Sequence, residues 1–196
     1  MEESAKIIDM IKPGQVIQKK IINDQEYIFR YPQGDDAGLL CAYINELSQE
    51  RTFIRFQGEE ITLEAEKKYV TNNLSKIAAG EKVVVLAFAA GVLVGNAEVT
   101  MKEKTEKHRG LVGITIKKDY RDKGLGTELL QLAMAQAQQE LPNLEILELR
   151  VYANNDRAIH LYKKLGFKEF GRLPRGIKRD DGYMDRIYMF KNVIIQ

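Results

Sequence analysis

A short segment near the middle of the chain carries residue types suited to binding an anion. Arg121 and Lys123 stand beside two glycines, Gly124 and Gly126, where a predicted strand leads into a predicted helix. The first amides of a helix lack intrahelical partners and lie at the positive end of its dipole. Glycine lets the backbone approach a phosphate closely, and the basic side chains add positive charge. The segment therefore predicts a phosphate-binding turn, although by itself it also fits an ordinary turn with solvated basic residues.

Two common nucleotide-binding motifs do not fit this segment. A P-loop requires lysine followed by serine or threonine after its last glycine, and no such pair follows Gly126. The dinucleotide-binding fingerprint requires a third glycine where this chain has Leu129. A pyrophosphate bound without a Walker lysine is the interpretation that remains.

A second block, about thirty residues further along, makes the interpretation specific. Residues 155–167 match the pattern N-x-x-A-x-x-L-Y-x-x-x-G-F at every defined position. The first segment matches R/Q-x-x-G-x-G/A through its arginine and both glycines. In these two blocks, and in their order, the chain resembles the GCN5-related N-acetyltransferase (GNAT) family over roughly residues 27–193.

The resemblance implies an α+β protein with a three-layer α/β/α arrangement around a mixed, centrally splayed sheet. The gap is expected between the strand ending near Lys117 and the strand from Leu144 to Tyr152, with acetyl-CoA bound in it. The implied organisation is an N-terminal extension over residues 1–26, which includes the first strand of a hairpin, followed by an N-acetyltransferase domain over residues 27–193.

The resemblance also implies which residues bind the cofactor. Amides of the glycine-containing loop would bind the pyrophosphate, and the preceding strand would bind the pantetheine arm and the thioester carbonyl. Residues of the second block would contact the cofactor from the opposite side. The expected cofactor-binding residues are Ile114, Thr115, Ile116, Arg121, Asp122, Lys123, Gly124, Leu125, Gly126, Thr127, Asn155, Ala158 and Tyr162.

Tyr162 occupies the family's position for a general acid. When an amine attacks a thioester, the departing sulfur is stabilised by a proton, and a phenol with a pKa near ~10 is protonated at neutral pH. The alternative is that Tyr162 only packs in the core. The base is less clear, because Gly110 and Leu111 stand where a glutamate is expected. Glu98 is the predicted base, with His108 as a second candidate and a water chain or an already neutral amine as alternatives.

Two charged segments are candidates for contacting the acceptor. One covers residues 51–60 and includes two glutamates, and the other covers residues 172–179 and is basic. The first would attract a cationic amine and the second an acidic one, so charge alone does not identify the acceptor. Both segments also fit ordinary charged surface loops.

Local patterning predicts the elements that position these residues in the first half of the chain. A hairpin is expected over residues 16–31, with its turn at Asn23-Asp24-Gln25. Asp35 or Asp36 can cap a first helix, and a second helix is expected from Thr62 to Gly80. Residues 83–88 and 92–101 predict a buried hairpin, followed by a strand at 111–116. The side chains expected to face inward from the two helices are Leu39, Leu40, Tyr43, Ile44, Leu47, Tyr69, Val70, Leu74 and Ile77.

The second half predicts a helix over residues 124–141, which Pro142 ends, and an alternating strand over 144–152. Asn154 or Asn155 then caps a short helix whose Ala158, Leu161, Tyr162 and Leu165 share one face and which ends at Gly166. Two last strands are expected over 167–170 and 183–190, joined by a long loop with a turn at Asp181-Gly182.

Composition limits the class of protein. The 196 residues, 44% of them hydrophobic and 30% charged, suit one soluble domain, and no window is apolar enough to span a membrane. The acidic N-terminus does not resemble a secretory signal, which favours the cytoplasm. The 30 basic and 28 acidic residues are mixed along the chain, which does not favour nucleic-acid binding. No metal is expected, and Cys41 is interpreted as a small core residue.

The resulting functional hypothesis is transfer of an acetyl group from acetyl-CoA to a primary amine, which could be a small molecule, a peptide N-terminus or a lysine. Three alternatives stay open: transfer of a longer acyl chain, a non-catalytic acyl-CoA-binding sensor, and a nucleic-acid-binding domain. Pairing of two copies as a homodimer through exposed strands, as in many relatives, also stays open.

Overall fold

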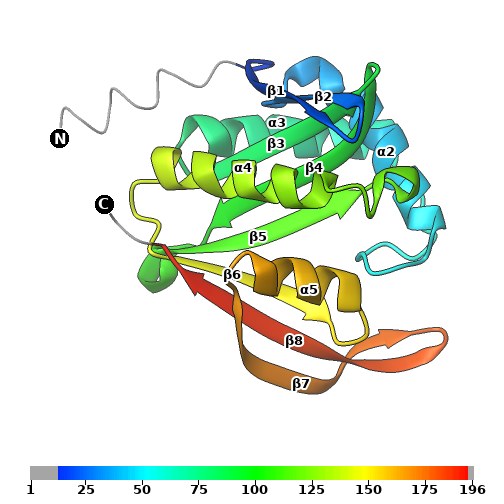
Figure 1. The fold of residues 1–196 in the computed structure, drawn as a ribbon, viewed down its shortest axis with the longest axis vertical. Coiled ribbons are helices and arrows are strands. Elements are labelled where there is room, and N and C mark those ends of the chain that lie inside the picture. Colours follow the sequence, from blue (N-terminus) through cyan, green and yellow to red (C-terminus); the bar gives the residue numbers. More distant parts are fainter. Residues whose placement is uncertain (1–12, 194–196) are drawn as a thin grey trace.

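A single sheet of eight strands organises the chain in the computed structural model, which describes residues 13–193 (Figure 1). The strand order is β1-β2-β3-β4-β5-β6-β8-β7, and only β5 and β6 pair in parallel. Residues 1–12 of the predicted N-terminal extension lie outside the described residues. The strands are β1 (Val16–Ile22), β2 (Gln25–Arg30), β3 (Lys82–Ala89), β4 (Val92–Met101), β5 (Arg109–Ile116), β6 (Ile146–Tyr152), β7 (Lys168–Arg179) and β8 (Gly182–Asn192).

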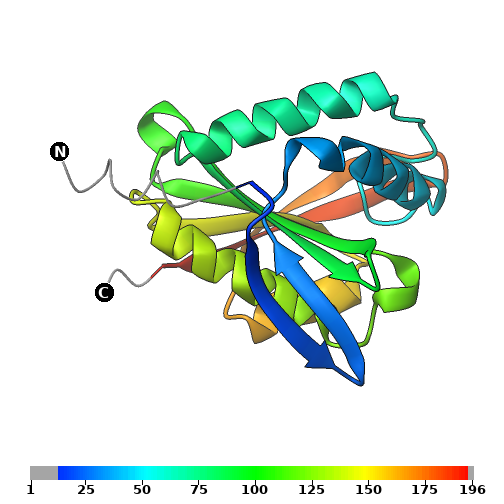
Figure 2. The ribbon, with the colours of Figure 1, turned by 90° about the horizontal axis from the view of Figure 1, so that it is seen from above.

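Helices cover both faces of the sheet, so the described chain has three layers (Figure 2). The helices α2 (Ala37–Gln49) and α3 (Leu63–Ala78) lie on one face, and α4 (Leu125–Glu140) and α5 (Asp156–Lys164) lie on the other. This confirms the predicted α/β/α arrangement around a mixed sheet. Between residues 13 and 193, no helix has both the length and the apolar character needed to cross a membrane.

The strand β3 shows why both faces need a helical cover. Every residue of β3 is buried, and its side chains alternate between two apolar cores. Val83, Val85 and Ala87 pack on the α4 side, whereas Val84 and Leu86 pack on the side of α2 and α3. A strand that is apolar on both sides can be stable only in the middle layer.

The predicted hairpin turns are confirmed. Asn23 and Asp24 join β1 to β2 with φ values of 49° and 63°, in the left-handed region that these two residue types tolerate. Ala90 and Gly91 join β3 to β4 with φ values of 47° and 79°. In this way β1, which falls in the predicted extension, pairs with β2 at the edge of the main sheet.

The predicted helix after the glycine-containing loop and the strand that follows it are also confirmed. The α4 helix buries the stripe predicted from its spacing, and β6 buries Leu147, Leu149 and Val151 while its alternate residues face away. The short helix α5 begins after Asn155, and Gly166 follows its end with φ of 88°.

Two side chains predicted to face inward do not. Leu39 on α2 is 45% exposed and Tyr69 on α3 is 41% exposed. Leu40, Tyr43 and Leu47 form the buried stripe of α2, and Leu39 lies about 100° away from Leu40 around the helix, outside that stripe. Tyr69 lies at the rim of the sheet, where its hydroxyl donates to Glu98 Oε2 at 3.2 Å.

Asp36 stands at the predicted N-cap position of α2, but its carboxylate makes no capping hydrogen bond to that helix and belongs to a capping box with Gln33 in the 3-10 turn just before it. It accepts instead from the Gln33 backbone N–H at 2.8 Å and from the Arg30 guanidinium at 2.6 and 2.7 Å. The ion pair with Arg30, a β2 residue, ties the start of α2 to the sheet and accounts for the burial of Asp36.

The long loop predicted between the last two strands is wrong as well. Residues 168–179 form the continuous strand β7, which pairs with β8 as a hairpin with a turn at residues 180–181. The pairing register shifts between Glu169 and Gly171 and again between Leu173 and Ile177. Each shift breaks the alternation of side chains, and Pro174 cannot donate to the ladder. The period of two by which a strand is identified in a sequence is therefore missing.

The two parallel strands at the centre of the sheet pair only at one end. Residues 109–111 of β5 lie opposite residues 146–148 of β6, and beyond them the strands separate. At the paired end, Glu148 forms ion pairs with the Arg109 guanidinium and, at 2.6 Å, with Lys102 Nζ. The sheet therefore opens toward the glycine-containing loop, which confirms the predicted central splay.

Replacing Glu148 with glutamine is expected to lower the free energy of unfolding by roughly 3 kcal/mol at pH 7, because two partly buried cations lose their counter-ion. Burial alone would raise the pKa of Glu148, but hydrogen bonds from Lys102 and Arg109 outweigh burial and hold the pKa below the ordinary 4.5. A pKa lowered by folding stabilises the fold above the unfolded-state value, and this contribution is lost as the pH falls through the folded-state value.

Denaturant unfolding at several pH values measures this effect. The difference between wild type and Glu148→Gln should be constant at neutral pH and shrink below pH 4.5. Glu106→Gln is the matched control, since Glu106 pairs with the same two cations but is 49% exposed, and we expect it to change stability by less than about 1 kcal/mol. A stability difference between wild type and Glu148→Gln that does not depend on pH would contradict the lowered pKa of Glu148.

Candidate active site

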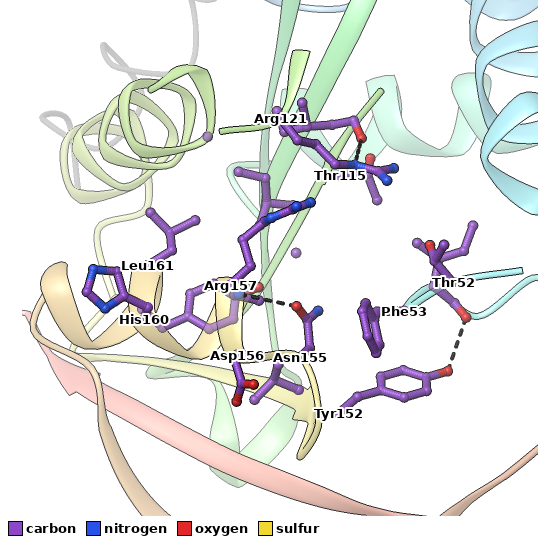
Figure 3. Close-up of a pocket in the computed structure, with 18 of the residues that line it drawn as sticks. Thr52, Phe53, Thr115, Arg121, Tyr152, Asn155, Asp156, Arg157, His160 and Leu161 are labelled. Atoms are coloured by element: carbon purple, nitrogen blue, oxygen red, sulfur yellow. Dashed lines mark hydrogen bonds between the residues drawn. The ribbon is translucent and has the colours of Figure 1, made fainter. Parts of the chain in front are cut away.

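A pocket of about 700 Å³ lies where β5 and β6 separate. Its walls come from the second half of β5, the end of β6, the loop before α4, the first turns of α4 and α5, and residues 52–54 between α2 and α3 (Figure 3). The splay thus gathers segments that are far apart in the sequence around one cavity.

The predicted phosphate-binding turn forms one end of this pocket. Gly124 directly precedes α4 with φ of 82°, and Asp122 also has a positive φ, of 60°. No side chain caps the start of α4, so its first amides stay available to an anion. This left-handed backbone conformation favours glycine at position 124, because a side chain would be strained there.

Arg121 lines the pocket, and protein contacts already hold its guanidinium. Its Nε donates to the Ile116 carbonyl at 2.8 Å, and its Nη1 lies 2.7 Å from Glu50 Oε2 at the end of α2 (Figure 3). Glu50 was not predicted, because nothing in the local pattern around it indicates contact with a loop about seventy residues away. The pair keeps a cation at the phosphate end and connects it to α2.

Not every residue of the predicted loop reaches the pocket with its side chain. Leu125 is fully buried in the core, and the ammonium of Lys123 lies over the Tyr120 ring at 5.8 Å. Leu125 can therefore contribute only its backbone amide, whereas Lys123 is exposed and does not line the pocket in this conformation. The lining residues from the loop and the first turn of α4 are Arg121, Asp122, Gly124, Gly126 and Thr127.

The end of β5 forms the long wall of the pocket. Ile114, Thr115 and Ile116 all line it, and past Leu111 the edge of β5 that faces β6 has no strand partner. Backbone groups on that edge are free to bind an extended ligand. The Thr115 hydroxyl accepts a hydrogen bond from Tyr43 at 2.9 Å, which places its side chain toward α2.

The start of α5 forms the opposite wall. Asn155 Oδ1 accepts from the Ala158 backbone N–H at 3.2 Å, so the asparagine caps the helix and leaves its amide nitrogen for another partner (Figure 3). Arg157 pairs with Asp122 at 2.7 Å and so connects α5 to the glycine-containing loop. The two predicted sequence blocks therefore face each other across the pocket.

Tyr162 lies on the pocket side of α5. It is 7% exposed, its ring packs against Phe167 at 5.9 Å, and it lines the pocket. Its hydroxyl makes no hydrogen bond to any residue between 13 and 193. Burial raises the pKa of Tyr162 to about 12, which keeps the phenol protonated throughout the physiological range. A buried, protonated and unpartnered hydroxyl is suited to donating a proton to a ligand.

The two predicted bases lie outside the pocket lining. Glu98 on β4 pairs with Lys82 at 2.8 Å and accepts from Tyr69, but it also neighbours Gly113, a lining residue without a side chain. His108 lies at the closed end of the splay, where its carbonyl accepts from the backbone N–H groups of residues 145 and 146. The structure therefore leaves Glu98 nearer to the pocket than His108.

Residues beyond the two blocks form the other end of the pocket. Phe53 and Tyr152 meet edge to face with ring centroids 5.6 Å apart, and the Tyr152 hydroxyl donates to the Ile54 carbonyl at 3.1 Å (Figure 3). Arg179 of β7 donates to the carbonyls of Arg51 and Thr52 at 2.8 and 3.0 Å. The two segments predicted to contact the acceptor therefore contact each other. Sequence reasoning did not find Tyr152 or the neighbouring Arg150, although both fall on the polar side of the alternating strand β6.

Across the described part of the chain, no group of three or more histidine, cysteine or carboxylate side chains could hold a metal ion. Cys41, for which no chemistry is predicted, donates its thiol to the Ile61 carbonyl at 3.3 Å.

The fold and the pocket together define a class of protein. A glycine-containing loop with uncapped helix amides and a free strand edge lie on one side of the splay, and a capped helix with a buried tyrosine lies on the other. This is the architecture of an acyl-CoA-dependent acyltransferase.

Comparison with known proteins identifies the family within that class. The model of the acetyltransferase (GNAT) family matches residues 40–167. A solved GNAT acetyltransferase from Streptococcus pneumoniae superposes with a TM-score of 0.78 and 31% identity, over 85% of this chain and 99% of that one. The chain belongs to the GNAT family, which confirms the predicted family and fold.

Curated relatives match over shorter stretches. An N-alpha-acetyltransferase from Sulfurisphaera tokodaii is 49% identical over 59 residues, which are 30% of this chain and 35% of that protein. An L-methionine sulfoximine/L-methionine sulfone acetyltransferase from Pseudomonas aeruginosa is 28% identical over 116 residues, 58% of this chain and 66% of that protein. The matches thus span from about a third to two thirds of these relatives.

Proposed function

We propose that the protein transfers an acetyl group from acetyl-CoA to a primary amine. The observation that carries this proposal is the Tyr162 hydroxyl inside the pocket, which is buried, protonated and without a hydrogen-bond partner among residues 13–193. Membership of the GNAT family and the phosphate-binding end of the same pocket support it. The names of the curated relatives, each an acetyltransferase, agree with it.

The pocket walls divide the binding of acetyl-CoA between them in this proposal. Backbone amides of residues 121–127, with the Arg121 guanidinium, bind the pyrophosphate. The free edge of β5 at residues 114–116 binds the pantetheine arm, and Asn155 and Ala158 contact it from α5. The width of the splay at Ile114 then determines whether a longer acyl chain also fits.

The proposed reaction exchanges one bond for another without a net change of charge on the protein. The amine nitrogen bonds to the thioester carbon as the carbon–sulfur bond breaks, and the sulfur takes a proton from Tyr162. The proton that the amine loses leaves toward Glu98 by way of water, past the bare backbone of Gly113. The proton taken up by Glu98 then passes through solvent to the Tyr162 oxygen, which returns both residues to their starting forms.

A sensor that binds acyl-CoA without turnover is the alternative from a different class. The lack of a carboxylate within the pocket at β5 favours it, whereas the unpartnered Tyr162 hydroxyl favours catalysis. We retain the enzyme as the better hypothesis, because a binding module gains nothing from a buried proton donor at that position.

The proposal extends to partners and location. For the acceptor, the relatives' names point to a peptide N-terminus or an amino-acid analogue.

We also propose a homodimer, because Phe170 on the β7–β8 hairpin is 56% exposed and contacts the rings of Tyr188 and Phe190, which makes an aromatic surface. Sedimentation at two concentrations tests it. The cytoplasm is the proposed location.

Release of free thiol from acetyl-CoA in the presence of a panel of amines tests the proposed function. The panel should contain free amino acids, peptides with free N-termini, a polyamine and a lysine-containing peptide. Thiol release that depends on an amine, with the acetylated amine detected by mass spectrometry, is the expected result. Tight binding of coenzyme A with no turnover on any acceptor would favour the sensor instead.

A further inference from the structure

The pocket has a different charge at its two ends. At the phosphate end, each arginine has an acidic partner: Arg121 pairs with Glu50 at 2.7 Å, and Arg157 pairs with Asp122 at 2.7 Å. The far end, beyond the splay point, is lined by residues 52–54, Arg150 and Tyr152. If acetyl-CoA enters with its phosphates at the first end, the far end is where the acceptor binds.

Arg150 differs from the other arginines of the pocket. It lies on β6 between the buried residues Leu149 and Val151, so its side chain is on the opposite face of the strand. That face is exposed at this position, and Arg150 makes no ion pair or hydrogen bond to any residue from 13 to 193. Its charge is therefore available to a ligand.

No described carboxylate forms an ion pair with Arg150. Among the described lining residues, the acidic ones are Asp122, which pairs with Arg157, and Asp156, which begins α5 and makes no ion pair with Arg150. Glu98, on β4 two strands away from β6, is already paired with Lys82. Arg186, which lies opposite Tyr152 on β8, adds a second positive charge without a described partner. An acceptor with several positive charges would be repelled here, and one with a negative charge would be attracted.

The surroundings of Arg150 are preorganised and partly aromatic. The Phe53 and Tyr152 rings pack edge to face at 5.6 Å. The loop that carries Phe53 is held by the Tyr152 hydroxyl on one side and by Arg179 of the β7–β8 hairpin on the other. A preorganised aromatic wall beside the unpaired Arg150 guanidinium suits a small ligand with a carboxylate and an apolar side chain.

We propose that the acceptor is an α-amino acid or an amino-acid-like amine, whose carboxylate Arg150 binds while its amine faces the thioester. This inference rests on the proposed acetyltransferase function and specifies its acceptor. It places peptide N-termini second, because the corresponding carbonyl of a peptide carries no charge. It places polyamines last, because they carry no anion at all.

Kinetic measurements on the wild-type protein with sets of closely related acceptors test the inference. For each of several L-amino acids, kcat/KM is measured for the acid, its carboxamide and the decarboxylated amine, with spermidine and short peptides alongside. We expect kcat/KM for the acids to exceed that for the carboxamides and amines by on the order of 10- to 100-fold. Acceptors without the carboxylate cannot form the charged hydrogen-bonded pair with Arg150. Arg150→Ala should remove this preference mainly by raising KM for the acids, while Arg150→Lys should retain part of it.

Arg172→Ala is the matched control, because Arg172 on β7 pairs with Asp185 and lies outside the pocket lining. It should leave the acid-to-amide ratio unchanged. Carboxamides or spermidine used as well as the acids, or a ratio that Arg150→Ala does not alter, would overturn the inference while leaving the acetyltransferase function intact. Acetylation of no amine at all, with coenzyme A bound, would overturn both.

Discussion

Replacing Tyr162 with phenylalanine is expected to lower kcat by on the order of 100-fold while changing the affinity for coenzyme A less than about twofold. The change removes only the hydroxyl, which has no partner among the described residues and whose loss leaves the ring packing on Phe167 in place. Thermal unfolding should therefore be nearly unchanged. Steady-state kinetics with a good acceptor, together with calorimetric titration of coenzyme A, separates the chemical role of Tyr162 from a structural one.

Tyr120→Phe serves as the control, because the Tyr120 ring contacts Tyr27 but does not line the pocket. Wild-type activity is expected for that variant. In the wild type, the pKa of about 12 also predicts that kcat does not decline between pH 7 and pH 10 through loss of the Tyr162 proton. An unchanged kcat in Tyr162→Phe would remove the assignment of the general acid.

Replacing Gly124 with glutamate is expected to weaken coenzyme A binding by at least about 100-fold. A carboxylate at the start of α4 would compete with the pyrophosphate for the same free amides and repel it. The residue also has φ of 82°, where a side chain is strained, and its Cβ would lie 3.4 Å from Ile22 on β1. Titration of coenzyme A by calorimetry or by protection against thermal unfolding measures the loss.

Gly91→Glu separates loss of binding from loss of folding. Gly91 has nearly the same backbone conformation, with φ of 79°, but it lies in the β3–β4 turn, where an added Cβ meets nothing within 4 Å. Both variants should lose a similar amount of stability, of about 1 kcal/mol, and only Gly124→Glu should lose the ligand. Equal affinity of the two variants for coenzyme A would refute the anion site.

Much of the fold could be predicted because its signals are local. The buried stripe of α4 and the alternation in β6 follow from periods of 3.6 and 2 residues, and they are present in the structure as predicted. The turn at Asn23 and Asp24 was recognisable because few residue types tolerate a positive φ. These features need no knowledge of distant contacts.

The failures have non-local causes. The part of β7 after Phe170 was predicted as a loop because two register shifts hide its alternation, and its pairing with β8 is a contact between distant residues. Leu39 and Tyr69 match an apolar pattern, but the position of the sheet relative to α2 and α3 determines which side of each helix is buried. The pattern of one segment contains no information about its neighbour.

The glycine-containing turn and the block from Asn155 to Phe167 predict membership of the GNAT family from the sequence, and the family comparison confirms it. Both features depend on the local conformation of a loop and of a helix start, which nearby residues determine. The end of the pocket that we propose for the acceptor was decided only by the tertiary structure. Phe53 lies about 100 residues before Arg150 and more than 120 before Arg179, and the three come together because β5 and β6 separate and the β7–β8 hairpin folds back on the α2–α3 loop.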